Sequence, residues 1–190
     1  MKELVFLLEE LSAKVMIEAI LPKISKPGTS VRYIVFQGKQ DLEKSIFRKL
    51  RGYNNPDAIF IVLRDQDAAD CKEVKSSLKR KCEQTGKSRI IVRIACRELE
   101  SWYLADLKAV EKAFCKKSLS SRQNEKKFRN SDNLKNPSKE LKMLVPEYQK
   151  INGSRMIASY MDPENTRSSS FYHFIRSIEK YLQKEEENHE

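Results

Sequence analysis

Acidic residues follow two apolar segments of the chain, and carboxylates in such places can bind metal ions. Glu9 and Glu10 follow a short apolar run, and Asp65 and Asp67 follow Ala58–Leu63, the most apolar run in the sequence. Side chains two residues apart on an extended segment point the same way, so Asp65 and Asp67 are expected to face one point. If the two segments are neighbouring strands of a parallel sheet, Glu9 joins the aspartates at the carboxyl edge, where ligands bind in open α/β sheets.

Carboxylates held so close repel one another unless a cation lies between them. Hard oxygen ligands suit Mg²⁺ or Mn²⁺. The spacing therefore predicts a divalent-metal site formed by Glu9, Asp65 and Asp67, of a kind suited to phosphodiester chemistry. A structural interpretation stands beside it, because Asp-x-Asp occurs by chance in charged loops and Asp after a strand often caps the next helix.

The elements that must position these acids alternate regularly in the first half of the chain. Apolar runs at 4–8, 31–36, 58–63 and 90–95 are separated by helical patterns at 12–21, 41–50 and 71–82. Strands that are apolar along their whole length are typical of a parallel sheet covered by helices on both faces. We therefore predict a mostly parallel, four-stranded α/β sheet of Rossmann-like class, with right-handed crossovers.

The second half of the chain is expected to form a helical C-terminal cap. Helices are predicted over 99–114, 139–150, 155–160 and 170–184, with a long basic loop over 118–139. The α/β core is assigned to residues 1–106 and the helical extension to residues 107–190, packed together as one compact unit. Trp102 is expected in the core between sheet and cap, and Asp106 in a structural or outer position.

Composition narrows the class of protein. The formal net charge is +10 despite an acidic tail at 185–190, and a basic balance either attracts nucleic acid or serves solubility alone. The cysteines form no Cys-x-x-Cys pair, and the chain has no long apolar span and no leader pattern, so we expect a cytoplasmic protein without membrane contact. With only His173 and His189, and no P-loop at Gly38-Lys39, neither a histidine-based nuclease nor nucleotide hydrolysis is expected.

Further acids and a basic residue lie beside the predicted strand ends. Glu98 and Glu100 follow the fourth apolar run and could complete the metal shell or position a water molecule. Their alternative role is to complement a helix dipole, which is worth about 0.3–1 kcal/mol. Arg64 could stabilise negative charge in a transition state, although a neighbour of Asp65 on a strand is expected to face the other side of the sheet.

Polar residues near the C-terminus are candidates for contact with phosphate or nucleic acid. Asn165, Arg167 and Ser168 precede a predicted helix, whose exposed N–H groups suit a phosphate, and an N-cap is the alternative role. Arg155 is a further candidate of the same type. A basic stretch could follow a nucleic-acid backbone or form a solvated loop; it consists of Lys116, Lys117, Arg122, Lys126, Lys127 and Arg129.

An acid after the first strand and Asp-x-Asp after the third resemble the Toprim fold, which topoisomerases, primases and nucleases of the overcoming-lysogenization-defect (OLD) type share. More closely, the chain resembles the prokaryotic family catalogued as domain of unknown function 4276 (DUF4276). The resemblance runs nearly end to end. It rests on Leu7–Lys14, Phe36–Lys39 with Asp41-Leu42, Leu50–Tyr53, Asp65–Asp67 with Asp70-Cys71, Arg97–Asp106, and Met161–Asn165 followed by Arg167–Phe171.

What the resemblance implies is a metal-dependent nuclease of Toprim type. Glu9 matches the Toprim glutamate, Asp65 and Asp67 match the paired aspartates, and Glu98 lies in a matching block. Nucleic acid as substrate, an ATPase partner of the ABC or OLD kind, and a role in phage defence are implied in the same way. A topoisomerase is not expected, because the chain has no room for gate domains.

Two positions depart from the Toprim pattern. Glu10 stands where many Toprim proteins have Gly, and Ala13 where OLD-type nucleases often have a second acid, which supports one metal ion better than two. The rival interpretation is a non-catalytic Toprim-fold subunit that binds nucleic acid or a partner protein. A purely structural relic of the fold is the third.

Overall fold

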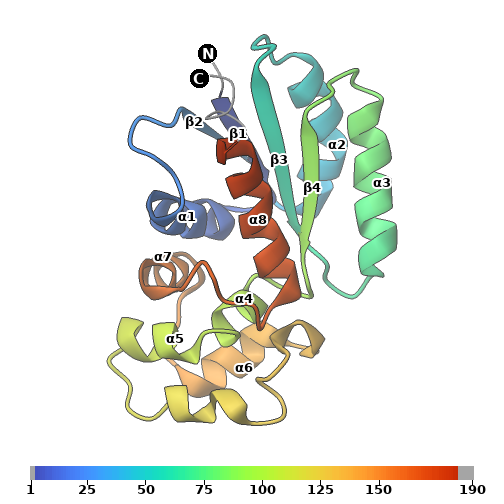
Figure 1. Cartoon of the computed structure of the whole chain (residues 1–190). Coiled ribbons are helices and arrows are strands. Elements are labelled where there is room, and N and C mark those ends of the chain that lie inside the picture. Colours follow the sequence, from blue (N-terminus) through green and yellow to red (C-terminus); the bar gives the residue numbers. More distant parts are fainter. Residues whose placement is uncertain (1–2, 184–190) are drawn as a thin grey trace.

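A computed structural model describes residues 3–183 and shows a parallel sheet between helices, with a helical cap at one end (Figure 1). All strand pairs are parallel, in the order β2-β1-β3-β4. The strands are β1 (Glu3–Leu8), β2 (Val31–Val35), β3 (Ala58–Asp65) and β4 (Ile90–Ala95). The predicted fold class is therefore confirmed, while the acidic tail at 185–190 and His189 lie outside the described residues.

The strand order creates a switch point between β1 and β3. The chain leaves β1 for β2 on one side and later returns to pair β3 with the other side. The register aligns Leu8 of β1 with Leu63 of β3, so the two strands reach the carboxyl edge of the sheet together. In open α/β sheets this is the place where ligands bind.

Alternating side chains of the strands build two apolar layers. Phe6 and Leu8 face the layer under α1 (Leu11–Ile20) and α8 (Ser169–Gln183), whereas Val5 and Leu7 face the other layer. That second layer is covered by α2 (Lys39–Arg51) and α3 (Cys71–Glu83). A strand with both faces buried needs apolar residues throughout, which is the pattern seen in the sequence.

The cap lies beyond the carboxyl ends of the strands (Figure 1). Its helices are α4 (Glu100–Leu104), α5 (Leu107–Ala113), α6 (Pro137–Leu144) and α7 (Lys150–Tyr160). Short 3-10 turns are η1 (Leu21–Lys23) after α1, and η2 (Ser120–Asn124) and η3 (Ser131–Asn133) in the cap.

The single helix predicted over 99–114 is wrong. The chain forms α4 and α5 instead, because the Asp106 carboxylate accepts a hydrogen bond from the Ala109 N–H at 3.1 Å and caps a new helix. The helices predicted over 139–150 and 155–160 also have other bounds. α6 ends before Pro146, and α7 begins at Lys150.

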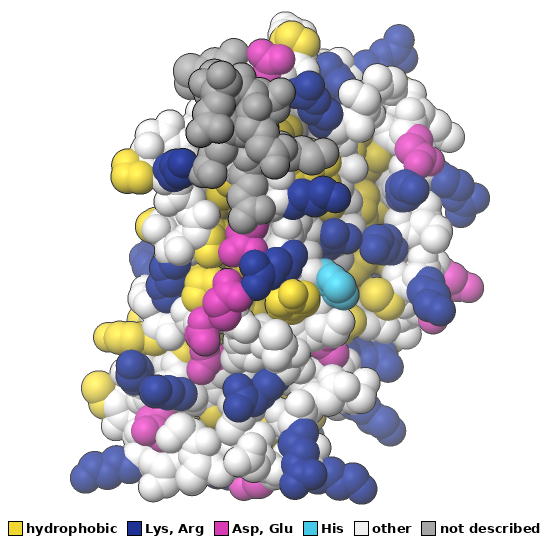
Figure 2. All heavy atoms as spheres, viewed as in Figure 1, with side chains coloured by type: hydrophobic (Ala, Val, Ile, Leu, Met, Phe, Trp, Pro, Cys, Tyr) yellow, Lys and Arg dark blue, Asp and Glu magenta, His cyan; other side chains and the backbone are white. Residues whose placement is uncertain are grey.

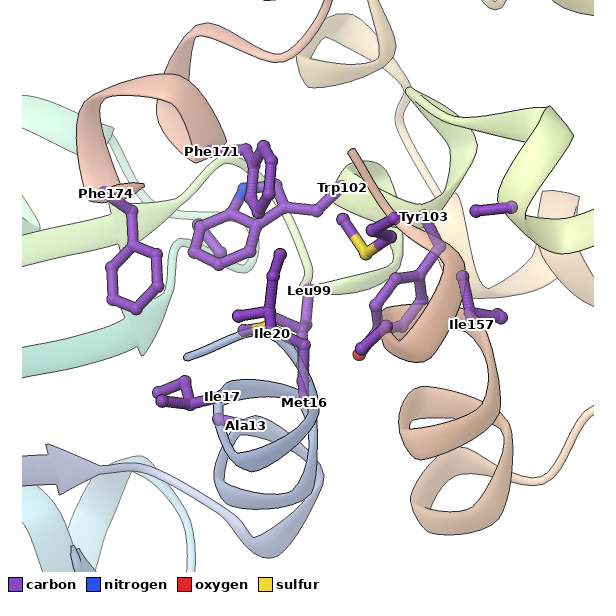
Figure 3. Close-up of a cluster of buried hydrophobic side chains, with 14 of the residues drawn as sticks. Ala13, Met16, Ile17, Ile20, Leu99, Trp102, Tyr103, Ile157, Phe171 and Phe174 are labelled. Carbon is purple, nitrogen blue, oxygen red and sulfur yellow. The ribbon is translucent and has the colours of Figure 1, made fainter. Parts of the chain in front are cut away.

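Sheet and cap share one apolar core, with Trp102 at its centre (Figure 3). The Trp102 side chain is completely buried, as predicted, and its ring centroid lies 5.3 Å from that of Phe171 and 5.1 Å from that of Phe174. Its indole N–H donates to the Ser170 hydroxyl at 2.7 Å. Side chains of α1, among them Met16 and Ile17, close the cluster from below in this view (Figure 3).

None of the helices formed by residues 3–183 is both long enough and apolar enough to cross a membrane.

Candidate functional site

Glu9 lies at the switch point and is held there by backbone hydrogen bonds. Its N–H donates to the carbonyl of Leu63 at 3.3 Å, and its carbonyl accepts from the N–H of Gly38 at 2.9 Å. Gly38 has φ 93°, a conformation that residues with a Cβ rarely adopt, so the turn that meets Glu9 suits glycine. The Glu9 carboxylate accepts a hydrogen bond from the N–H of Asp65 at 3.1 Å. The structure therefore brings Glu9 to the Asp-x-Asp segment.

Asp65 and Asp67 do not face one point, contrary to the expectation from alternation. The strand ends at Asp65, and Asp67 has φ 58°, so the backbone between them is not extended. Asp67 turns outward and pairs with Lys39 at 2.9 Å. Its backbone is tied to Arg97, which also has a positive φ of 62°, because the Asp67 N–H donates to the Arg97 carbonyl at 2.8 Å.

The acids divide between the two faces of the sheet. Glu9 follows Leu7 toward the α2 side, where the Arg64 guanidinium lies 3.8 Å from the Glu9 carboxylate and 2.5 Å from that of Glu43. Arg64 thus points away from Asp65, as a strand neighbour should. Burial raises the pKa of Glu9, and the negative charge of Asp67 adds to the rise.

On the other face, Asp65 belongs to a second group of carboxylates. We call Asp65, Glu10 and Glu100 the acidic cluster. Burial, and then the negative charges of Glu10, Glu100 and Glu9, raise the pKa of Asp65 well above its usual range. Glu10 reaches this face because its backbone is extended, with φ −152° and ψ 167°, before α1 begins.

Lys150, at the start of α7, forms an ion pair with the acidic cluster. Its ammonium lies 2.6 Å and 2.8 Å from the two carboxylate oxygens of Glu10. Burial lowers the pKa of Lys150, but the hydrogen bond to Glu10 and the charges of Glu100, Glu10 and Asp65 raise it overall. Lys150 therefore stays charged and offsets part of the repulsion.

Glu100 is the most deeply buried acid of the cluster. The residue is 2% exposed, and one carboxylate oxygen accepts from the Tyr148 hydroxyl at 3.0 Å. The other oxygen, Oε2, is buried without a hydrogen-bond partner among residues 3–183. Burial raises the pKa of Glu100, and a nearby Glu98 adds to the rise. An unpartnered carboxylate oxygen is costly in this setting, and a cation or a proton would remove the cost.

The donor set fits a hard divalent cation, although its side chains are not yet arranged as ligands. In the described part of the chain, no three His, Cys, Asp or Glu side chains stand close enough together to hold a metal ion. What the structure does show is carboxylates with raised pKa values beside an unpartnered oxygen. Such oxygens are the ligand type that Mg²⁺ and Mn²⁺ prefer.

Glu98 binds the N-terminus of a cap helix in this structure. Its carboxylate accepts a hydrogen bond from the N–H of Ser138 at 2.8 Å, in the first turn of α6. That contact complements a helix N-terminus, as the alternative interpretation held, but the helix is α6 and not the one that Glu98 precedes. Glu98 lies near Glu100, and its negative charge helps to raise the pKa of Glu100.

The predicted phosphate contacts near the C-terminus are mostly engaged with the protein. The Asn165 amide donates to the Ala105 carbonyl at 2.9 Å, and the Ser168 hydroxyl accepts from the Phe171 N–H at 3.0 Å as an N-cap would. Arg155 and Arg167 are exposed. Asn165 and Arg167 line a common hollow, together with Asp106 and Asp162.

Sequence reasoning missed the contributions of Glu10, Lys150 and Tyr148. Glu10 was treated as a departure from a pattern, although the doublet Glu9-Glu10 on an extended segment places one acid on each face of the sheet. Lys150 and Tyr148 are more than 80 residues away from Asp65 along the chain, and no local pattern marks them.

Fold and site together define a Toprim-like α/β protein with acidic residues at the switch point. A family description matches residues 8–179, and the chain belongs to that family, Domain of unknown function (DUF4276). Among solved structures, the chain is similar to the C-terminal region of the Burkholderia pseudomallei OLD protein, with a TM-score of 0.57. The match covers 94% of this chain and 98% of that one at 12% sequence identity, so the likeness is one of fold. No curated protein matches the chain.

Proposed function

We propose that this protein is a metal-dependent nuclease of Toprim type that hydrolyses phosphodiester bonds of nucleic acid. The observation that carries the proposal is the acidic cluster at the switch point. There burial and neighbouring acids raise the pKa of Asp65, and Glu100 keeps a buried, unpartnered oxygen. A fold rarely retains such repulsion without a use for it, and perturbed carboxylates concentrate at functional sites.

Each side chain has a role in this proposal. Asp65 and Glu100 would hold the cation, Mg²⁺ or Mn²⁺. Glu9, which accepts the Asp65 N–H and whose charge raises the pKa of Asp65, would reach the cation around the carboxyl edge that separates the two faces. Asp67 and Glu98 would be further ligands when their present contacts open. The bound ion supplies polarisation of the scissile phosphate and stabilisation of the leaving oxygen. Lys150 and Lys39 hold Glu10 and Asp67 in place through the ion pairs described above, and Tyr148 orients Glu100 through its hydroxyl.

A non-catalytic binding subunit is the second candidate, and a specific observation favours it. Lys150 and Lys39 already neutralise Glu10 and Asp67 within the chain. A site needs no metal ion if its own lysines balance its charged carboxylates and its remaining carboxyl groups, whose pKa values are raised, stay protonated. In that case the fold would serve to bind nucleic acid or a partner protein.

An ATPase partner and a role in phage defence belong to the same proposal. Their support is the fold shared with the C-terminal region of an OLD protein, together with the family resemblance. The formal charge of +10 supports nucleic acid as the ligand.

A cleavage assay tests the proposal. Purified protein is incubated with supercoiled plasmid, single-stranded DNA and structured RNA, with Mg²⁺ or Mn²⁺, alone and with a co-encoded ATPase. We expect cleavage by the wild type and its loss in the Asp65→Ala/Asp67→Ala variant. A Glu18→Ala/Glu83→Ala variant is the matched control, because it removes two exposed acids near the C-terminal ends of α1 and α3, which run away from the carboxyl edge of the sheet.

The outcomes separate the two candidates. Cleavage that the control keeps and the double variant loses supports the nuclease. No cleavage by any form, with every ATPase and metal combination tried, contradicts it and favours the binding subunit.

A further inference from the structure

A hollow of about 710 Å³ opens in the cap between the basic loop and α6. Its lining includes the side chains of Lys126, Lys135, Lys139, Asn130, Asn133 and Met143. This hollow, which we call the lysine groove, is separate from the acidic cluster and takes no part in the contacts described above.

The charge of the groove is strongly positive. Residues 116–142 carry nine Lys or Arg and three acids, a surplus of six within the formal +10 of the chain. Lys127 pairs with Glu140 at 2.8 Å and covers the ring of Phe128. Lys126, Lys135 and Lys139 have no ion pair or hydrogen bond from their ammonium groups within residues 3–183. Figure 2 shows dark blue Lys and Arg side chains around the lower end of the molecule, over the cap.

The remaining lining suits the rest of a nucleotide. Asn side chains carry both donors and acceptors, which can pair with the edges of unstacked bases. Met143 is 56% exposed and offers an apolar surface for a base. The volume is that of a site for a small molecule, so one or two nucleotides of an unpaired strand fit where a duplex would not.

The groove is tied to the acidic cluster through α6. Ser138, whose N–H donates to the Glu98 carboxylate, directly precedes Lys139 of the groove. Glu98 is followed two residues later by Glu100. The cap lies at the carboxyl end of the sheet (Figure 1), and Asp65 of the cluster is the last residue of β3.

We propose that the lysine groove binds single-stranded nucleic acid and delivers the strand to the acidic cluster. Lys126, Lys135 and Lys139 contact phosphates, and the Asn side chains and Met143 contact unstacked bases. This inference rests on the proposed nuclease function and names its substrate class as a strand with unpaired bases.

Binding is measured without cleavage, by fluorescence anisotropy of labelled single-stranded DNA and RNA in EDTA over a series of salt concentrations. The test variant is Lys126→Glu/Lys135→Glu/Lys139→Glu. The matched control is Lys44→Glu/Lys75→Glu/Lys180→Glu, which makes the same charge change at exposed positions of α2, α3 and α8. Thermal melts check that both variants are folded before binding is compared. A milder variant, with Gln at the same three groove positions, serves if the Glu variant fails to fold.

We expect the groove variant to bind both strands about tenfold more weakly or worse, and the slope of log K against log salt to shrink by about 2, near 0.7 for each lost phosphate contact. The control should stay within about twofold of the wild type, since it changes only the general charge. Equal affinities of groove variant and control overturn the proposal. The proposal is also overturned if free AMP displaces the strand when the two are present at equal concentration. The groove would then be a site for a free nucleotide.

Failure here is distinguishable from failure of the proposed function. A protein that binds strands through the groove but never cuts them contradicts only the nuclease. A protein that cuts with Mg²⁺, and whose binding ignores the groove variant, contradicts only the groove.

Discussion

At the scale of single residues, the molecule keeps acids close together where solvent screens them poorly. Asp65 is the clearest case, because its pKa is raised by burial and by three neighbouring glutamates. Between the usual Asp pKa of 3.8 and the raised value, the folded protein binds more protons than the unfolded chain. Stability therefore falls as the pH rises through that window.

Asp65→Asn removes the free-energy cost of ionising a buried carboxyl group. We expect the variant to have a higher melting temperature than the wild type at pH 8, by about 2–4 °C for each kcal/mol of added stability. One unit of pKa corresponds to about 1.4 kcal/mol. The difference should shrink as the pH falls toward 3.8, because below that pH Asp65 is protonated in the folded protein and increasingly in the unfolded chain. Melting temperatures of the two proteins from pH 4 to pH 8 measure it. A variant that is less stable than the wild type at pH 8 would contradict the direction given for Asp65.

A divalent cation should relieve the same repulsion. At a concentration of 100 times the dissociation constant, Mg²⁺ or Mn²⁺ is expected to stabilise the wild type by about 2.7 kcal/mol. Glu100→Gln and Asp65→Asn should lose most of that shift, whereas Glu83→Gln at the far end of α3 should keep it. Differential scanning fluorimetry with and without metal, against extra NaCl as the control for ionic strength, measures the effect. Equal shifts in all the proteins would point to non-specific binding.

Residue types and spacing were enough to predict that Glu9 reaches the Asp-x-Asp segment. They were not enough to predict that Asp67 turns away, since its positive φ depends on hydrogen bonds to Arg97 from another strand end. Glu100 was proposed as a ligand from its place after the fourth strand. Its burial under Tyr148 depends on packing of the cap, which no local pattern contains.

At the scale of elements, apolar periodicity predicted every strand and most helices, because the central strands β1 and β3 are buried on both faces and most helices on one. The errors fall in the cap. The break between α4 and α5 depends on the side chain of Asp106, which caps α5 and also accepts the Asp162 N–H at 3.0 Å. A pattern of apolar residues continues across that break, so periodicity could not reveal it.

One element links the cap to the acidic cluster by close packing. A Cβ built on Gly153 of α7 would overlap a ring carbon of Tyr148, whose hydroxyl donates to Glu100. Ala in place of Gly usually stabilises a helix by about 0.5–1 kcal/mol. Here we expect Gly153→Ala to destabilise the protein by about 1–3 kcal/mol, because the ring must move.

Urea unfolding of Gly153→Ala measures the sign, and Asn152→Ala is the matched control on the exposed side of the same helix. The control should be neutral or slightly stabilising. If Gly153→Ala behaved like the control, Tyr148 would not be held against α7, and its role in orienting Glu100 would lose support.

At the scale of the whole molecule, sheet and cap are joined by one apolar cluster that runs from Leu4 in β1 to Ile178 in α8. Trp102 lies in this cluster between α1 and α8, so its fluorescence reports the contact between sheet and cap (Figure 3). Because neither part has a separate core on that side, we expect one cooperative unfolding transition.

Phe174→Ala should lower the free energy of unfolding by about 3–5 kcal/mol, because it leaves a cavity against Trp102. Urea unfolding followed by Trp102 fluorescence and by far-UV circular dichroism should give coincident curves for the wild type and for the variant. If the fluorescence changed first and much of the helical signal survived, the cap would unfold by itself, and residues 1–106 would form an independent core.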